Sequence, residues 1–189
     1  MEERSDAQLV AAYLKGEEAA FTALVNRHLK AVYGFVLRRS GDRATAEDVS
    51  QEAFVKAWRN LRRFDRKKKF LTWILAIANN SLLDSLKKKK PVPFTYLESE
   101  DGGTDFADTL RDESPLPPEL FERKDLAEAV NRAMARLAPE QEETVRLYHQ
   151  GGLTFSEISQ VMGKGLDTVK TRYYRALAKL RQILTGKGG

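Results

Sequence analysis

Apolar residues recur three or four positions apart along most of the chain, a spacing that predicts helices. In the first half this pattern predicts four helices, over 5–15, 17–39, 44–61 and 70–88. In the second half it predicts helices over 119–136 and 140–149, followed by a helical hairpin over 154–181. No strand-like alternation interrupts these segments, so the sequence predicts an all-α fold.

The hairpin carries clear signals for its turns. Thr154 and Glu157 have the spacing of a capping box, in which each side chain bonds the other residue's backbone N–H. Gly163 and Gly165 follow the first helix, and glycine allows the sharp turn that a side chain would resist. The pattern therefore indicates two helices joined by a tight turn.

The second helix of the hairpin is predicted to begin at Asp167 or Thr168. One face is apolar, at Val169, Tyr173, Ala176, Leu180 and Ile183. The opposite face is basic, at Lys170, Arg172, Arg175 and Lys179. An apolar back and a basic front are typical of a helix-turn-helix that places its second helix in the major groove. The alternative is an amphipathic hairpin whose basic face is only solvated.

The stretch 91–118 lacks helical spacing, holds five of the six prolines and is acidic. It is expected to be a flexible linker between two small helical domains, 1–90 and 119–189, the second containing the helix-turn-helix. A chain of this length reaches about 90–100 Å when extended. As a free coil it averages about 30 Å.

Composition narrows the class of protein. The 189 residues carry a net charge of +5 and no cysteine, so disulfides and thiolate metal sites are excluded. His28 and His149 lie far apart, and we expect surface or helix-end residues rather than metal ligands. The polar start and the lack of a long apolar run indicate no signal peptide and no membrane span. We expect a cytoplasmic protein with no cofactor, no metal and no catalytic residues.

A strongly basic block spans 59–90, with eleven basic and two acidic residues. Aromatic residues interrupt it, which is typical of a surface that binds phosphates and stacks on bases. Trp73 is in step with Ile77 on the apolar stripe, so packing is its expected role, whereas Phe64 lies in a loop and is expected to be freer for a ligand. Asn80 and Lys87 share one helical edge. An asparagine on such an edge is usually a plain polar surface residue, but beside the basic block Asn80 becomes a candidate base reader.

A polar edge is predicted on the helix over 44–61, where Asp48, Gln51 and Glu52 stand three and four positions apart. This edge is either an ordinary solvated face or a docking surface for a basic partner, and periodicity does not choose between them. Trp58 falls on the apolar stripe of the same helix.

Three stretches together resemble bacterial extracytoplasmic-function sigma factors: AEDVSQEAFVKAWRNLRRFD, FLTWILAIANNSLLDSLKKKK and LAPEQEETVRLYHQGGLTFSEISQVMGKGLDTVKTRYYRALAKLR. The resemblance covers the chain from about 5 to 184. It implies a bacterial protein that binds core RNA polymerase, carries it to promoters and helps to separate the strands, with no enzymatic activity of its own.

The resemblance also implies site residues. Contacts to the clamp of the largest polymerase subunit fall on Asp48, Gln51, Glu52 and Trp58, and a second contact is expected at the flap region. Contacts to the melted −10 element fall on Phe64, Lys67, Trp73, Asn80 and Lys87. Contacts to the double-stranded −35 element fall on Thr168, Lys170, Thr171, Arg172, Tyr174 and Arg175. Relatives are commonly held by an anti-sigma factor, and one is expected here.

The chain departs from the family pattern at 165–167 and at Asn79, where many relatives carry a basic residue. Two other classes of protein remain to be weighed. A stand-alone helix-turn-helix regulator would need a dimer face or a ligand pocket, and the sequence indicates neither. An enzyme would need more than Asp48 and Glu52, which lack a third ligand for a metal.

Overall fold

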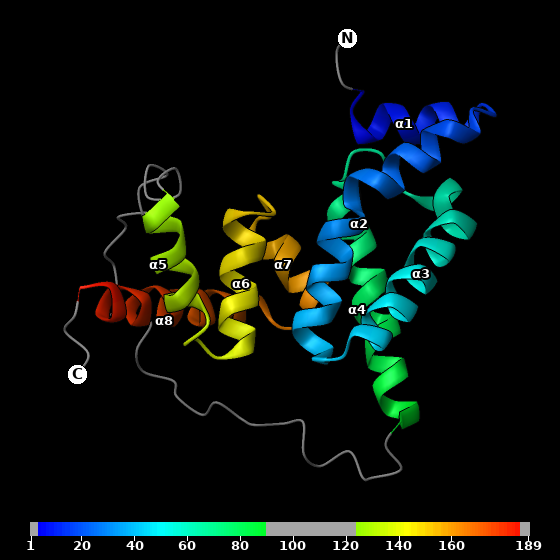
Figure 1. Ribbon diagram of the computed structural model, residues 1–189. Coiled ribbons are helices and arrows are strands. Elements are labelled where there is room, and N and C mark those ends of the chain that lie inside the picture. Colours follow the sequence, from blue (N-terminus) through cyan, green and yellow to red (C-terminus); the bar gives the residue numbers. More distant parts are fainter. Residues whose placement is uncertain (1–3, 90–123, 186–189) are drawn as a thin grey trace.

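The computed structural model describes residues 4–89 and 124–185, and every regular element within these ranges is a helix (Figure 1). The helices are α1 Asp6–Leu14, α2 Glu18–Ser40, α3 Arg43–Asn60, α4 Phe70–Lys89, α5 Lys124–Met134, α6 Pro139–His149, α7 Phe155–Met162 and α8 Leu166–Leu184, with a short 3-10 turn, η1 Leu61–Arg63. The predicted all-α fold is confirmed. The predicted linker lies outside the described residues. Within the described ranges, no helix has both the length and the apolar character needed to cross a bilayer.

Side-chain caps explain where several helices begin. At α1, Ser5 accepts a bond from the backbone N–H of Gln8, whose side chain accepts one from the backbone of Ser5. At α7, Thr154 and Glu157 make the same reciprocal pair, as the sequence predicts. At α3, the Asp42 carboxylate accepts bonds from the backbone N–H and the hydroxyl of Thr45. These caps satisfy donors that a helix start leaves without partners.

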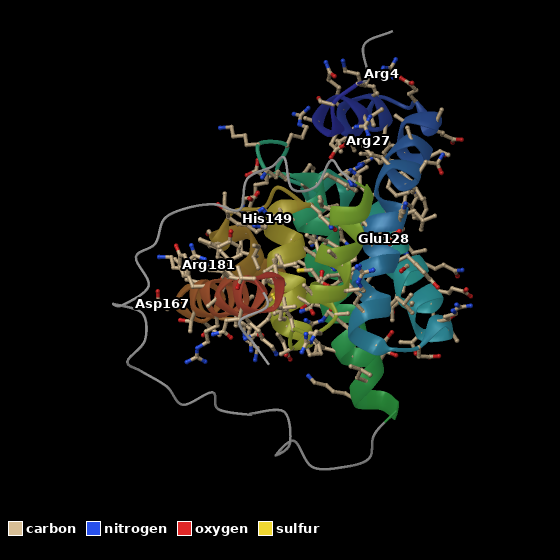
Figure 2. All side chains as sticks on the ribbon, turned by 60° about the vertical axis from the view of Figure 1, so that its left-hand side comes forward. Arg4, Arg27, Glu128, His149, Asp167 and Arg181 are labelled. Carbon is tan, nitrogen blue, oxygen red and sulfur yellow. The ribbon has the colours of Figure 1, made fainter. Side chains whose placement is uncertain are left out.

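The start of α8 differs from the prediction. The helix begins at Leu166 with Gly165 as its N-cap, so neither Asp167 nor Thr168 caps it. The reason is the tight exit from α7, where Gly163 takes the left-handed conformation (φ 63°) and returns the chain to helix early. Asp167 instead lies exposed in the first turn of α8 (Figure 2), where a negative charge suits the helix dipole.

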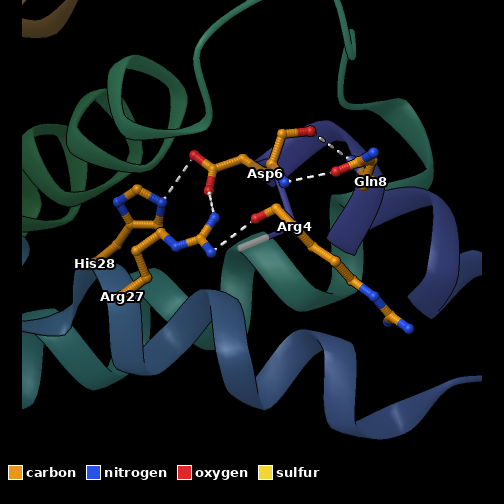
Figure 3. A network of polar contacts seen from close by, with 6 residues as sticks. Arg4, Asp6, Gln8, Arg27 and His28 are labelled. Atoms are coloured by element: carbon orange, nitrogen blue, oxygen red, sulfur yellow. Dashed lines mark hydrogen bonds and ion pairs between the residues drawn. The ribbon is translucent and has the colours of Figure 1, made fainter. Parts of the chain in front are cut away.

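A polar network ties α1 to α2 (Figure 3). Asp6 accepts hydrogen bonds from Arg27 Nη1 at 2.7 Å and from His28 Nε2 at 2.9 Å, and Arg27 also donates to the carbonyl of Arg4 at 2.8 Å. Burial alone would raise the pKa of Asp6, but the bonds from His28 and Arg27 hold it below its usual value. His28 is only 8% exposed, so the expectation of a surface or helix-end residue is wrong for it.

The core of the first half centres on Phe70, the first residue of α4, which is fully buried. Its ring lies 5.2 Å from His28, 5.5 Å from Phe64 and 5.7 Å from Trp73, measured between ring centroids. Aromatic pairs at these separations stabilise a core beyond the area they bury. This group of rings connects α2, the loop after η1 and α4.

The buried face predicted for α8 is confirmed at four positions, and Ile183 is only half-buried. Three of the four, Tyr173, Ala176 and Leu180, pack in a second group of buried side chains together with Ala133, Met134, Leu137 and Val145. Leu137 precedes Pro139, whose fixed φ suits the first turn of α6. The second half therefore folds around the back of α8.

The two halves are in contact, a feature that helical spacing did not predict. Helix α7 packs against α4, and α6 contacts α2 (Figure 1). Six buried residues of the second half continue the core of the first: Leu147, Leu153, Ile158, Val161, Met162 and Val169. The first helix of the helix-turn-helix thus lies against the last helix of the first half.

Candidate nucleic-acid and polymerase interfaces

A hollow of about 480 Å³ opens between α3, η1 and α4. It is lined by Lys56, Asn60, Arg63, Trp73, Ile77 and Asn80. The three residues from α4 stand at i, i+4 and i+7, so they share one face of that helix. Aromatic and aliphatic walls beside amides and cations suit a flat ring that also carries hydrogen-bonding groups.

Phe64 packs against Trp73, one of the residues that line this hollow. The expectation that its loop position frees it for a ligand is wrong, because Phe64 is 7% exposed. The 3-10 turn directs the chain inward, and the Phe64 ring packs 5.0 Å from Trp73 and edge-on to Phe70. Trp73 therefore combines the packing role predicted for it with a place in the wall of the hollow.

The polar lining comes partly from residues that the sequence did not identify. Lys56 Nζ lies 2.8 Å from a Glu52 carboxylate oxygen and donates to Ser81 Oγ at 2.9 Å. The Asn60 side chain donates to the carbonyl of Lys56 at 2.8 Å. Lys56, Asn60 and Arg63 do have helical spacing, so their shared face could have been found once the basic block was noticed.

Exposed basic side chains are concentrated in the segment that carries Arg63, one of the residues lining the hollow. Exposed members lie in η1 and the loop after it: Arg62, Arg63, Arg66, Lys67, Lys68 and Lys69. Asp65 shapes this loop by accepting the backbone N–H of Lys67 at 3.0 Å. Lys87 is exposed on α4, about 10 Å along the helix from Asn80. Asn79, in contrast, is 2% exposed and does not reach the surface where a phosphate would lie.

A second surface follows one edge of α3. Its exposed members are Asp48, Gln51, Glu52, Val55 and Trp58. The placement of Trp58 on the buried stripe is wrong: it is 50% exposed, and its indole N–H bonds the Tyr13 hydroxyl on α1. Val55, 45% exposed, was missed, although it stands three residues from both Glu52 and Trp58. Exposed aromatic and aliphatic groups beside carboxylates are typical of a protein interface.

The third surface is the outer side of α8. Thr168, Lys170 and Tyr174 are exposed, while Thr171, Arg172 and Arg175 are half-buried. The structure thus brings all six predicted −35 residues onto the first three turns of one helix. Burial lowers the pKa of Arg39 of α2, and the charge of Arg172 lowers it further.

An aromatic cluster fixes α8 against α6 and α7, and the sequence offered no periodic signal for it. Its members are Tyr148, His149, Phe155, Tyr173 and Tyr174. Burial lowers the pKa of His149 and raises the pKa of Tyr173 to about 12. Both groups are therefore neutral near pH 7, and the Tyr173 hydroxyl and His149 Nε2 share a hydrogen bond of 3.0 Å.

Two family models match the chain. The family model Sigma-70 region 2 matches residues 24–92, which include the hollow and the α3 edge. The model Sigma-70, region 4 matches residues 127–180, which include the helix-turn-helix.

Two curated relatives are similar over most of their length. The ECF RNA polymerase sigma factor SigW of Bacillus subtilis (strain 168) is 31% identical over 90% of this chain and 91% of its own. The ECF RNA polymerase sigma factor SigM of Mycobacterium tuberculosis (strain ATCC 25618 / H37Rv) is 30% identical over 96% of this chain and 86% of its own.

Solved structures share the fold. CnrH, in complex with the cytosolic domain of CnrY, has a TM-score of 0.59 and 25% identity over 97% of this chain and 99% of its own. The sigma factor RpoE of Bartonella quintana, in complex with the anti-sigma factor NepR, has a TM-score of 0.57 and 22% identity over 87% of this chain and 96% of its own. The chain belongs to the extracytoplasmic-function family of RNA polymerase sigma factors, which are transcription initiation factors rather than enzymes and direct the polymerase to promoters.

Proposed function

We propose that domain 1–90 docks on core polymerase through the α3 edge and receives one extruded base of the −10 element in the hollow. The observation that carries this proposal is the meeting of Trp73 and Asn80 in one hollow with Lys56, Asn60 and Arg63. Unstacking a base costs a few kcal/mol, and stacking on an aromatic ring returns about 1–3 kcal/mol. The amide of Asn80 then reads the edge of the base.

Domain 119–189 reads the −35 element through the outer side of α8. Lys170 and Tyr174 are exposed there, and Arg175 lies one turn beyond Thr171 on the same side. Insertion of this helix into the major groove brings such side chains to base edges and phosphates. The aromatic cluster supports this reading because it holds α8 rigidly against α6 and α7.

The proposed cellular location follows from the two proposed partners, core polymerase and promoter DNA. Core polymerase and promoter DNA are found together in the bacterial cytoplasm, so the chain acts there, and it has no enzymatic activity of its own. The matched structures of CnrH and RpoE each contain a second protein, named an anti-sigma factor for RpoE. By this likeness an anti-sigma factor holds the present chain inactive until it is needed.

The direct test is run-off transcription with purified chain and core polymerase on a library of random promoters. We expect transcripts from a defined set of sequences that share a −10 and a −35 element. Tight DNA binding without core polymerase, and no transcripts with it, would instead support the stand-alone regulator.

Replacing Asn80 by alanine is expected to impair promoter opening more than the initial binding of polymerase. The loss of a hydrogen bond to an extruded base corresponds to about tenfold in the opening equilibrium. Permanganate reactivity of the melted strand reports opening, and a gel-shift assay reports binding. The matched control is Asn26→Ala, an exposed residue of α2 outside the hollow. An equal loss of opening and binding would argue against the base-reading role.

Replacing Arg175 by alanine is expected to weaken transcription from promoters that depend on the −35 element by about tenfold, or ~1.4 kcal/mol. A readout on promoters with a base change at each −35 position should show relaxed preference at one position. Arg181→Ala serves as the control, because Arg181 lies further along α8 on a different face. An unchanged promoter preference in Arg175→Ala would remove Arg175 from the reading surface.

A further inference from the structure

Helix α1 contacts the exposed edge of α3 through Tyr13. The indole N–H of Trp58, in the last turn of α3, donates a hydrogen bond to the hydroxyl of Tyr13, in the last turn of α1. Figure 1 shows both helices. The match to Sigma-70 region 2 starts at residue 24, so α1 and Tyr13 lie outside it. The bond therefore connects the α3 edge to a helix that the family model does not cover.

Tyr13 is held in place on its own side of this bond. Its ring packs against Phe21 of α2, with 5.5 Å between the ring centroids, and both rings lie against the core of the first half. The carbonyl of Tyr13 accepts the backbone N–H of Gly16 at 2.9 Å, where a left-handed φ of 103° turns the chain toward α2. The network around Asp6 fixes the other end of α1. The Tyr13 hydroxyl is thus presented from a fixed position.

Trp58 is exposed although its indole N–H is bonded. It continues a stripe of exposed side chains on α3, because Gln51, Val55 and Trp58 stand at i, i+4 and i+7. An exposed side chain of this kind ordinarily samples several rotamers. The bond restricts that freedom, since the indole has a single N–H on one edge of the ring and this N–H must point at Tyr13.

A restricted tryptophan at the end of this stripe has a consequence for binding. Tryptophan is prominent among the residues that dominate the energetics of protein interfaces. Ordering a mobile side chain during association weakens binding, and a side chain that is already ordered avoids this loss. Because the N–H already has its partner within the chain, the face of the ring that stays exposed is apolar and suits an apolar side chain of a partner.

We propose that Tyr13 is a positioning residue for the docking of core polymerase, and that it holds Trp58 in the orientation that the polymerase receives. This inference rests on the proposed function, which places the α3 edge on core polymerase. Helix α1 then belongs to the docking surface through Tyr13. The complementary surface of the polymerase carries cations opposite Asp48 and Glu52 and apolar side chains opposite Val55 and Trp58.

The test compares Tyr13→Phe with Tyr33→Phe. Both remove one hydroxyl from a half-buried tyrosine, but Tyr33 lies on α2 and takes no part in the bond to Trp58. The first measurement is the affinity of the full chain for immobilised, purified core polymerase. The second is the NMR spectrum of the indole N–H groups in the isotope-labelled chain, which has two tryptophans. Trp58→Phe identifies which of the two signals belongs to Trp58.

Tyr13→Phe keeps the ring on Phe21, so its midpoint of thermal unfolding should stay within about 4 °C of the wild type. The Trp58 signal should shift and exchange faster with water, while the Trp73 signal stays in place. Affinity for core polymerase should fall about three- to tenfold. In a Trp58→Phe background, which keeps a ring but has no N–H, Tyr13→Phe should cause no further loss. Tyr33→Phe should match the wild type.

Two results would overturn the role of Tyr13: wild-type affinity of Tyr13→Phe for core polymerase, or the same loss of affinity with and without the Trp58 indole. The second result would mean that Tyr13 acts through something other than Trp58.

Failure of the proposed function gives a different pattern. If Asp48→Asn and Trp58→Ala both bind core polymerase as the wild type does, the α3 edge is not the docking surface, and the inference fails with it. If these two variants lose affinity and Tyr13→Phe does not, the docking surface is supported and only the role of Tyr13 fails.

Discussion

Replacing Phe70 by alanine is expected to lower the free energy of unfolding by about 3–5 kcal/mol. Phe70 is fully buried, and its ring contacts His28, Phe64 and Trp73 together. Truncation leaves a cavity that three rings on different elements cannot fill without moving. Because the same rings support the wall of the hollow, promoter opening should fall as well. Urea unfolding followed by circular dichroism measures the first effect.

Two companion variants make this expectation specific. Phe70→Leu keeps most of the volume and should lose less than Phe70→Ala. Leu83→Ala lies on the same helix but is 37% exposed, so it should change stability by less than about 1 kcal/mol. Equal losses in Phe70→Ala and Leu83→Ala would mean that the ring group is not the centre of the first core.

Replacing Gly151 by alanine is expected to lower the free energy of unfolding by about 3 kcal/mol, the upper end of the usual range for overpacking. An added Cβ would lie 2.7 Å from the carbonyl oxygen of Leu147 and 2.9 Å from Leu153 Cδ1. The first of these atoms is backbone of α6, and it accepts the N–H of Leu153, so it cannot simply move aside. Thermal unfolding measures the loss.

Gly165→Ala is the matched control for this second prediction. A Cβ at Gly165 would meet only Thr168 Oγ1, at 3.7 Å, which is ordinary contact. Its φ of −60° also suits alanine, so the change should stay within about 0.5 kcal/mol. If both glycine variants lost the same stability, close approach at Gly151 would not be the cause.

Most helices of the fold could be predicted from local sequence signals. A capping box is recognised from residues three positions apart, which is why the start of α7 was predicted at Thr154. The buried face of α8 followed from spacing alone, because a single helix determines which residues share a side. The start of α8 was missed because two competing caps, Asp167 and Thr168, were preferred over Gly165.

The surroundings of several side chains depend on tertiary packing and could not be predicted from local sequence signals. Trp58 was predicted to be buried because it falls on the apolar stripe of its helix, and Phe64 was predicted to be exposed because it lies in a loop. Neither position shows which side chains a neighbouring element covers, so both predictions were wrong. Trp58 is held outside by Tyr13 of α1, and Phe64 is turned inside by η1. The ion pair of Arg38 with Glu143 could not be predicted from the sequence either, because the two residues are more than a hundred positions apart.

The network of Asp6 with Arg27 and His28 bears on where the first folded half of the chain begins. The match to Sigma-70 region 2 starts at residue 24, which leaves α1 outside it. Asp6 nevertheless provides the carboxylate that bonds His28. The His28 ring packs against Phe70, and Phe70 packs against Trp73, which lines the hollow. A fragment that begins at residue 24 would lack Asp6, so His28 would lose its carboxylate partner beside the Phe70 ring. A fragment of the first half that keeps this contact therefore starts near Ser5.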